Sequence, residues 1–203
     1  MARRALIVGA GAADRIAAGL SADFEVSRQP GATELDLVVW ADYPAIACRP
    51  TPIIDLTPND WDAACDAPLR SAIDLARAVH EPLAATEGTI VFLVPLMASA
   101  GGAGYAALAG LGEGVRLLAK SLAKTWGTDG ITAHAVTLDP HAFLAAGDAA
   151  GIAADNSLHD PPLGRIPDDR DDVAPIIEWL ASDTARPLTG TSLVVDGGLW
   201  MPG

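Results

Sequence analysis

The sequence contains few aromatic residues, few cysteines and few basic residues. Aromatics make up 5% of its 203 residues, and its two cysteines are Cys48 and Cys65. Two cysteines cannot form a disulfide framework, and no Cys/His cluster has the spacing of a metal site, so we expect both to pack as small hydrophobic residues. Lys and Arg number 13 against 26 Asp and Glu, a formal net charge of −13. Because nucleic acids and anionic membranes attract basic surfaces, we expect neither as a partner.

Long apolar runs are also missing. No run approaches the ~18 residues that a membrane span needs. The segment MARRALIVGAGAA places basic residues before an apolar run, but a signal peptide would have a longer apolar core and a cleavage site. We therefore expect a protein of the cytoplasm.

Small and branched apolar residues are abundant, and hydrophobic residues make up 50% of the chain. Short apolar runs alternate with helix-like segments, which is typical of a parallel α/β sheet. We predict strands at 5–8, 24–27, 35–40, 89–94, 132–137 and 192–195, and helices at about 12–20, 57–80, 103–126 and 171–182. A turn at 29–31, an extended loop at 52–55 and a long connection at 139–167 complete the chain. The predicted fold is a Rossmann-like, doubly wound parallel sheet of about six strands, with residues 1–203 in one domain.

The second predicted helix has a clear start signal. Thr57 is expected as its N-cap, with Pro58 at the first helical position and Asp60 as the acidic third residue. A proline inside a helix removes one hydrogen bond, so we expect a bend at Pro68.

Two parts of the sequence carry motifs of a known family. Residues 161–199 contain PLGRI and DDVAPIIEWLASDTARPLTGTSLVVDGG, which resemble the ending PLGR…VA…FLASD…ITGQ…VDGG of the short-chain dehydrogenase/reductase family. Within residues 54–138, NDWDAACDAPLRSAIDLARAV resembles its fourth helix, and LLAKSLAKTWGTDGITAHAV its fifth helix with the following strand. The resemblance implies a Rossmann-type sheet, an NAD(P) cofactor, catalysis by Asn, Ser, Tyr and Lys, and pairing of these helices between subunits.

The positions that this resemblance assigns to catalysis carry other residues. The Tyr-x-x-x-Lys pair falls on Leu108 and Gly112, and the serine thirteen residues before the tyrosine falls on Pro95. The structural asparagine of the fourth helix falls on Pro68.

A second alignment with the family pattern is possible around Tyr105, but it does not restore the Tyr-x-x-x-Lys pair. An insertion of three residues would bring Tyr105 to the tyrosine position, Ala109 to the lysine position and Phe92 to the serine position. The first lysine of the helix, Lys120, would lie about 22 Å further along it, too far to lower the pKa of a phenol. We therefore predict that the usual hydride-transfer chemistry is absent.

The turn after the first strand keeps two glycines, Gly9 and Gly11. The family's T-G-x-x-x-G-x-G loop would need further glycines where Ala13 and Arg15 stand, and the G-x-G-x-x-G version would need one at Asp14. An acid at a helix N-terminus competes with a phosphate for the positive end of the dipole. We predict a vestigial loop and no cofactor in the usual mode, with Arg15 as a phosphate ligand as the alternative.

The adenine side of a nucleotide site is predicted to be missing. The chain passes through residues 28–35 directly into the third strand, where the family has a helix, a strand and a helix. Trp40 and Tyr43 then stand where the adenine ribose would pass. We expect them to fill the vacated groove, with a ligand-stacking role as the alternative.

The remaining acid/base candidates are His134, His141, His159, Asp139 and Asp160. We expect the first to be a packed or hydrogen-bonded strand residue, and the other two histidines to be solvated, with a pocket as the alternative. The acidic cluster at 168–172 is predicted to be a solvated helix cap.

The predicted helix near 103–126 is rich in glycine, with Gly104, Gly110, Gly112 and Gly114 close together. Helical glycine costs roughly 1 kcal/mol relative to alanine, so we expect another backbone to approach closely. The alternative is a helix that begins only at Glu113. The resemblance implies pairing of both helices between subunits, so association, with a family member or with itself, is expected through the helices near 58–80 and 103–126.

Three functions follow as hypotheses. The first is a non-catalytic subunit that associates with a catalytically complete family member and stabilises or regulates it. The rival is an NAD(P)-dependent oxidoreductase acting on a hydroxyl or carbonyl of an acyl thioester or similar small substrate, with relocated groups such as Tyr105. The third is a homodimeric protein that binds a small acid or thioester.

Overall fold

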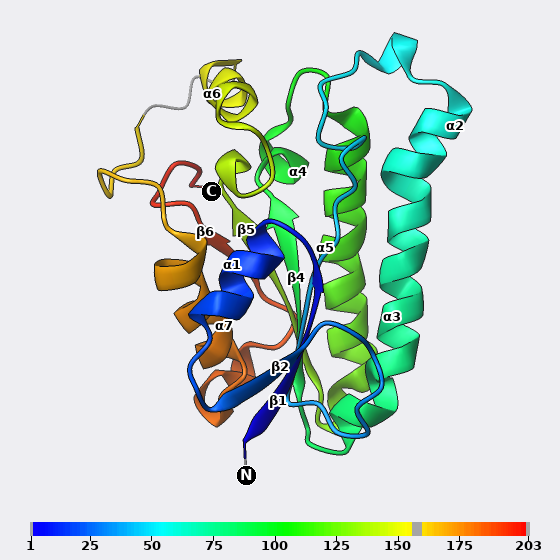
Figure 1. The fold of residues 1–203 in the computed structure, drawn as a ribbon, viewed down its shortest axis with the longest axis vertical. Coiled ribbons are helices and arrows are strands. Elements are labelled where there is room, and N and C mark those ends of the chain that lie inside the picture. Colours follow the sequence, from blue (N-terminus) through cyan, green and yellow to red (C-terminus); the bar gives the residue numbers. More distant parts are fainter. Residues whose placement is uncertain (1, 156–159, 202–203) are drawn as a thin grey trace.

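Six strands form one parallel sheet in the computed structural model, which describes residues 2–155 and 160–201 (Figure 1). They are β1 (Arg3–Gly9), β2 (Phe24–Ser27), β3 (Leu37–Ala41), β4 (Thr89–Pro95), β5 (Thr132–Leu138) and β6 (Ser192–Val195). Their order in the sheet is β2-β1-β3-β4-β5-β6. The predicted Rossmann-like sheet is confirmed, and every predicted strand is present.

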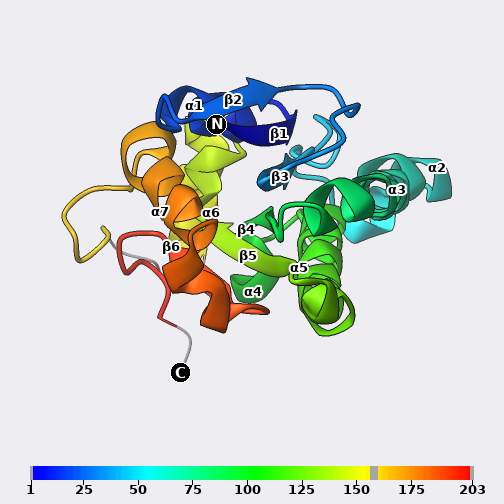
Figure 2. The same cartoon turned by 90° about the horizontal axis from the view of Figure 1, so that it is seen from below.

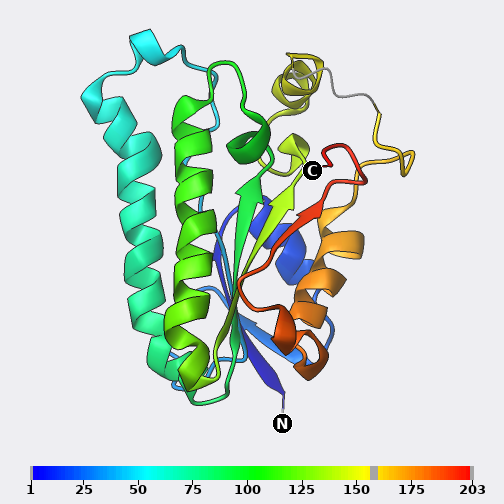
Figure 3. The same ribbon diagram turned by 180° about the vertical axis from the view of Figure 1, so that it is seen from behind.

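Helices cover both faces of the sheet (Figure 2). α1 (Ala12–Gly19) and α7 (Ala174–Leu180) pack on one face, and α3 (Ala67–Ala84) and α5 (Ala106–Trp126) on the other. Figures 1 and 3 show α3 and α5 side by side. Every residue of β3, β4 and β5 is buried, since helices cover both faces of these strands.

At the β2 edge of the sheet, no helix lies between β2 and the next strand, β3. The chain runs through residues 28–36 without a helix, and β3 then pairs with β1. Phe24 and Val26 pack on the α1 and α7 face, whereas Glu25 on the other face is exposed. The predicted loss of a helix, a strand and a helix between β2 and β3 therefore agrees with the topology.

The helix predicted from Thr57 has the expected N-cap, but the structure divides it into three consecutive segments. The Asp60 N–H donates to the Thr57 hydroxyl, and the Thr57 N–H donates to the Asp60 carboxylate, both at 3.2 Å. α2 (Pro58–Trp61) is followed by the π-helical turn η2 (Asp62–Asp66) and then by α3, which continues to Ala84. The predicted bend thus takes the form of a π turn just before Pro68, a residue that lacks a backbone donor.

Four sequence predictions need correction. The alternative start of α5 at Glu113 is wrong, because the helix begins at Ala106 and includes Gly110, Gly112 and Gly114. The loop at 52–55 contains the 3₁₀ turn η1 (Ile53–Asp55). The connection after β5 contains η4 (Pro140–Ala142) and α6 (Ala146–Asp155). The helix predicted at 171–182 is the π turn η5 (Asp169–Val173) followed by the shorter α7.

The remaining elements are short. They are α4 (Met97–Ala100), η3 (Gly127–Asp129) and η6 (Asp183–Leu188). Among the described helices, none combines the length and apolar character needed to cross a bilayer.

Candidate functional site

The positions assigned to catalysis meet where β4 ends and α5 begins. Pro95 is the last residue of β4, and Leu108 and Gly112 lie one turn apart on the inner side of α5, where both are buried. A Cβ added to Gly112 would lie 2.8 Å from the Ala98 Cβ and 3.1 Å from the Pro95 Cδ. The space that a lysine would need at this position is therefore filled. Pro68, at the asparagine position, is buried in the first turn of α3.

Tyr105 lies at the N-cap of α5 and is not an activated phenol. It is 3% exposed, and its hydroxyl has no hydrogen-bond partner among the described residues. Burial raises the pKa of this phenol, with Asp148 and Cys48 adding to the shift. A phenol that exchanges a proton near neutral pH needs its pKa lowered by a nearby cation. Only Lys120 and Lys124 could provide an ammonium, since the sequence has no other lysine, and both are exposed in the second half of α5.

Two glycines shape the turn after β1, and a carboxylate of the chain itself lies where a phosphate would bind. Gly9 and Gly11 have φ angles of 120° and 63°. A Cβ on Gly9 would lie 2.3 Å from the Ala41 carbonyl oxygen. The Gly11 N–H donates to the Asp14 carboxylate at 2.9 Å, and the other oxygen of that carboxylate binds Arg28 at 2.7 Å. A carboxylate thus occupies the helix end that would attract a phosphate.

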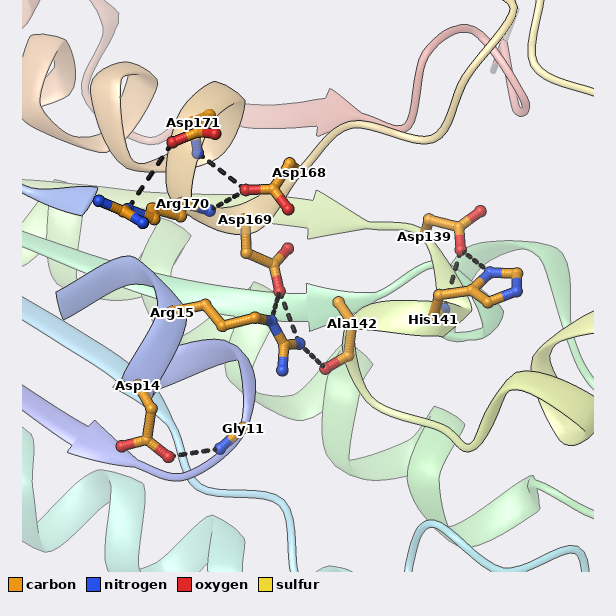
Figure 4. A network of polar contacts seen from close by, with 10 residues as sticks. All are labelled: Gly11, Asp14, Arg15, Asp139, His141, Ala142, Asp168, Asp169, Arg170 and Asp171. Atoms are coloured by element: carbon orange, nitrogen blue, oxygen red, sulfur yellow. Dashed lines mark hydrogen bonds and ion pairs between the residues drawn. The ribbon is translucent and has the colours of Figure 1, made fainter. Parts of the chain in front are cut away.

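Arg15 spans the cleft beside this turn (Figure 4). Its guanidinium donates to the Asp169 carboxylate at 2.8 Å and to the Ala142 carbonyl oxygen at 3.0 Å. The Asp169 side chain is 7% exposed, and burial raises the pKa of this carboxyl, an effect that the Arg15 hydrogen bond and charge oppose. Arg15 is therefore bound to the protein instead of pointing freely toward a ligand.

Aromatic side chains pack together beyond the carboxyl ends of the central strands, next to the point where the strand order reverses between β1 and β3, the usual ligand position in an open α/β sheet. The Tyr43 ring contacts Trp40 and Phe143 edge to face, with centroids 5.1 and 5.0 Å apart. The Tyr43 hydroxyl donates to the Leu93 carbonyl oxygen at 2.7 Å. Both predicted groove fillers, Trp40 and Tyr43, thus pack within the chain.

A dinucleotide does not fit the residues present. The Gly11 N–H at the N-cap of α1 already donates to the Asp14 carboxylate, and the cation just after β2 that could meet a 2′-phosphate, Arg28, is paired with that same carboxylate. We derive no reaction step through this cofactor. Among the described residues, no group of three or more His, Cys, Asp or Glu side chains could hold a metal ion.

His141 lines a small cavity, so the structure agrees with the alternative prediction that this residue lies in a pocket. The cavity holds about 160 Å³ at the carboxyl ends of β5 and β6, and Arg15 and Asp169 also line it. The His141 Nδ1 lies 2.6 Å from the buried Asp139 carboxylate, and the His141 side chain is 36% exposed. His159 lies outside the described residues, and Asp160 is exposed.

His134 is packed within β5, as predicted. It is fully buried, and neither ring nitrogen has a hydrogen-bond partner in residues 2–155 and 160–201. Burial lowers the pKa of this imidazole to about 4. His134 therefore stays neutral at physiological pH and lies away from the cavity.

The acidic cluster at 168–172 is only partly a solvated cap. The Asp168 carboxylate accepts hydrogen bonds from the Arg170 and Asp171 N–H groups, both at 2.9 Å, so the predicted cap is present. Asp169 is the exception, because it points inward to Arg15 (Figure 4). The sequence showed the acid and the arginine, but their pairing spans 154 positions and has no local signal.

Comparisons with known proteins agree with the fold. The family described as Enoyl-(Acyl carrier protein) reductase matches residues 33–200. A tropinone reductase homolog of Arabidopsis thaliana is 30% identical over 77% of this chain, and a 3-oxoacyl-[acyl-carrier-protein] reductase of Staphylococcus epidermidis is 28% identical over 70%. A solved structure of a putative short-chain alcohol dehydrogenase from Sinorhizobium meliloti superposes with a TM-score of 0.81 at 21% identity, covering 97% of this chain and 96% of that one.

The alignments with the two named reductases each cover 59% of the relative's length. The family match includes α3, α5 and the C-terminal strand, the same elements whose sequences carry the resemblance. The chain belongs to the short-chain dehydrogenase/reductase family.

Proposed function

We propose that this chain is a non-catalytic member of its family that associates with a catalytically complete member and stabilises or regulates it. The packing between α5 and the end of β4 carries the proposal. Leu108 and Gly112 stand at the tyrosine and lysine positions, and apolar groups fill the space beside them. A lysine at position 112 would have to displace Pro95 or Ala98.

The outer side of α5 supports the association. Gly110 is exposed, and a Cβ added there would meet only the Cys65 Sγ at 3.5 Å and the Trp61 ring at 3.7 Å, which are ordinary contacts. Internal packing therefore gives no reason for this glycine, although it costs roughly 1 kcal/mol relative to alanine. Leu117, two helical turns further on the same side, is 55% exposed. Close approach of a partner helix would account for both residues.

The test is co-expression with a family member that has the complete Tyr-x-x-x-Lys pair, followed by the mass of the purified assembly. We expect a mixed assembly that Gly110→Leu disrupts. Gly151→Leu in α6 is the matched control, because an added Cβ there also meets no crowding. A chain that forms only a homodimer beside every such partner would contradict the proposal.

An oxidoreductase is the second candidate, and the relatives favour it, since those named above are reductases. This candidate requires Tyr105 or another group to exchange a proton at the cleft. Consumption of NADPH or NADH by the isolated chain with a short 3-oxoacyl thioester would favour it over the first proposal.

A further inference from the structure

We infer that Asp14, Arg15 and Arg28 replace a dinucleotide as the link between α1 and the carboxyl edge of the sheet. The inference concerns the vacated cofactor cleft and goes beyond the proposed function, because it requires no partner. In a dinucleotide-binding fold the pyrophosphate lies against the first turn of this helix and bridges it to the neighbouring loops. Here the chain's own charges make that bridge.

The first link is an anion with its counterion. Asp14 places its carboxylate 2.9 Å from the Gly11 N–H, and Arg28 from the end of β2 binds the other carboxylate oxygen at 2.7 Å. Arg28 also donates to the carbonyl oxygens of Gly9 and Ala13. The loop between β1 and α1 is thereby fixed on both sides without an external phosphate.

The second link crosses the cleft. Arg15 leaves α1 and binds both Asp169 of η5 and the Ala142 carbonyl oxygen beyond β5 (Figure 4). These three segments are far apart in the sequence and share no strand pairing with one another. Because Asp169 is 7% exposed, loss of Arg15 would leave a buried carboxylate without its cation.

Aromatic side chains add to these two links, because they occupy space that a dinucleotide would need. Tyr43 and Phe143 pack edge to face in the crevice, and the Tyr43 hydroxyl is held by the Leu93 carbonyl oxygen. A Cβ added to Gly9 would lie 2.3 Å from the Ala41 carbonyl oxygen, so the turn after β1 packs directly against the end of β3. The Tyr43 and Phe143 side chains occupy space that a bound nucleotide would need.

Thermal unfolding of the full chain tests the inference. We expect Arg15→Gln and Asp169→Asn each to lower Tm by roughly 4–8 °C, because each breaks the pair between Arg15, whose side chain is 45% exposed, and the buried Asp169 carboxylate. Arg77→Gln is the control: Arg77 and Asp74 form a pair with side chains 75% and 70% exposed, and its loss should shift Tm by less than ~2 °C.

A second measurement uses the wild-type chain with 1 mM NADPH or NADH. We expect no change in Tm, whereas a site with a Kd of about 10 µM would raise Tm by roughly 5–10 °C. An upward shift with either dinucleotide, or Arg15→Gln and Asp169→Asn variants as stable as Arg77→Gln, would overturn the inference. Neither result bears on the proposed association, which is measured by the mass of a mixed assembly.

Discussion

The two sides of α5 both carry a glycine, but for different reasons. On the inner side, Gly112 is needed because Pro95 and Ala98 leave no room for a side chain. On the outer side, Gly110 is exposed, and an alanine would fit against its neighbours. The comparison shows that Gly112, which we predict at the lysine position, is part of the core, whereas position 110 has room for a side chain.

The largest expected effect comes from placing a lysine on the inner side. Gly112→Lys should lower the free energy of unfolding by about 3 kcal/mol or more, since it overpacks the contact with Pro95 and buries a charge. Urea unfolding measures this effect. Gly127→Lys, where an added Cβ meets nothing within 4 Å, is the control. Equal stability of the two variants would show that the inner side of α5 is not more tightly packed than an exposed position.

Acid should weaken the core at His134. Its pKa is about 4 in the folded chain against an ordinary value of 6.5, so the folded state favours the neutral imidazole. The stability from this group is complete above pH 6.5 and is lost as the pH falls toward 4, by about 3 kcal/mol. Urea unfolding of wild type and His134→Val across this range measures the loss. An identical pH dependence of both proteins would show that His134 does not cause it.

On the outer side, Leu117→Asp should act on association alone. We expect the affinity for the partner to fall about tenfold, because an exposed apolar contact is replaced by a charge, and the lone chain to keep its stability within ~0.5 kcal/mol. A titration of labelled partner measures the affinity. Ala154→Asp on the exposed side of α6 serves as the control. A loss of affinity in both variants would point to general charge repulsion instead of this helix face.

The smallest effect is expected for Gly110→Ala. The isolated chain should gain about 1 kcal/mol of stability, because alanine favours the helix and no internal contact opposes it. The same change should weaken the mixed assembly. A decrease in the stability of the isolated chain would show that Gly110 serves internal packing.

Much of the fold could be predicted because its signals are local. The cap formed by Thr57 and Asp60 follows from residues three apart, and the strands Phe24–Ser27 and Ser192–Val195 were bounded correctly by their apolar runs. The close contact at Gly112 could not be predicted, since it depends on how β4 approaches α5.

The charge pairs across the sheet edge also could not be predicted from the sequence. Arg15 was considered as a phosphate ligand and Asp169 as part of a solvated cap, yet the two side chains bind each other. Such a pairing depends on the folded positions of α1 and η5, and each residue alone fits a different local explanation.

The most direct test of the central claim uses the mixed assembly with an inactivated partner. The catalytic tyrosine of the complete family member is replaced by phenylalanine, and NADPH-dependent turnover of the purified assembly is measured. Our account predicts an intact mixed assembly with no turnover, because this chain offers no acid/base pair at Leu108 and Gly112. Turnover that persists in that assembly, or a partner that never joins this chain, would contradict the account.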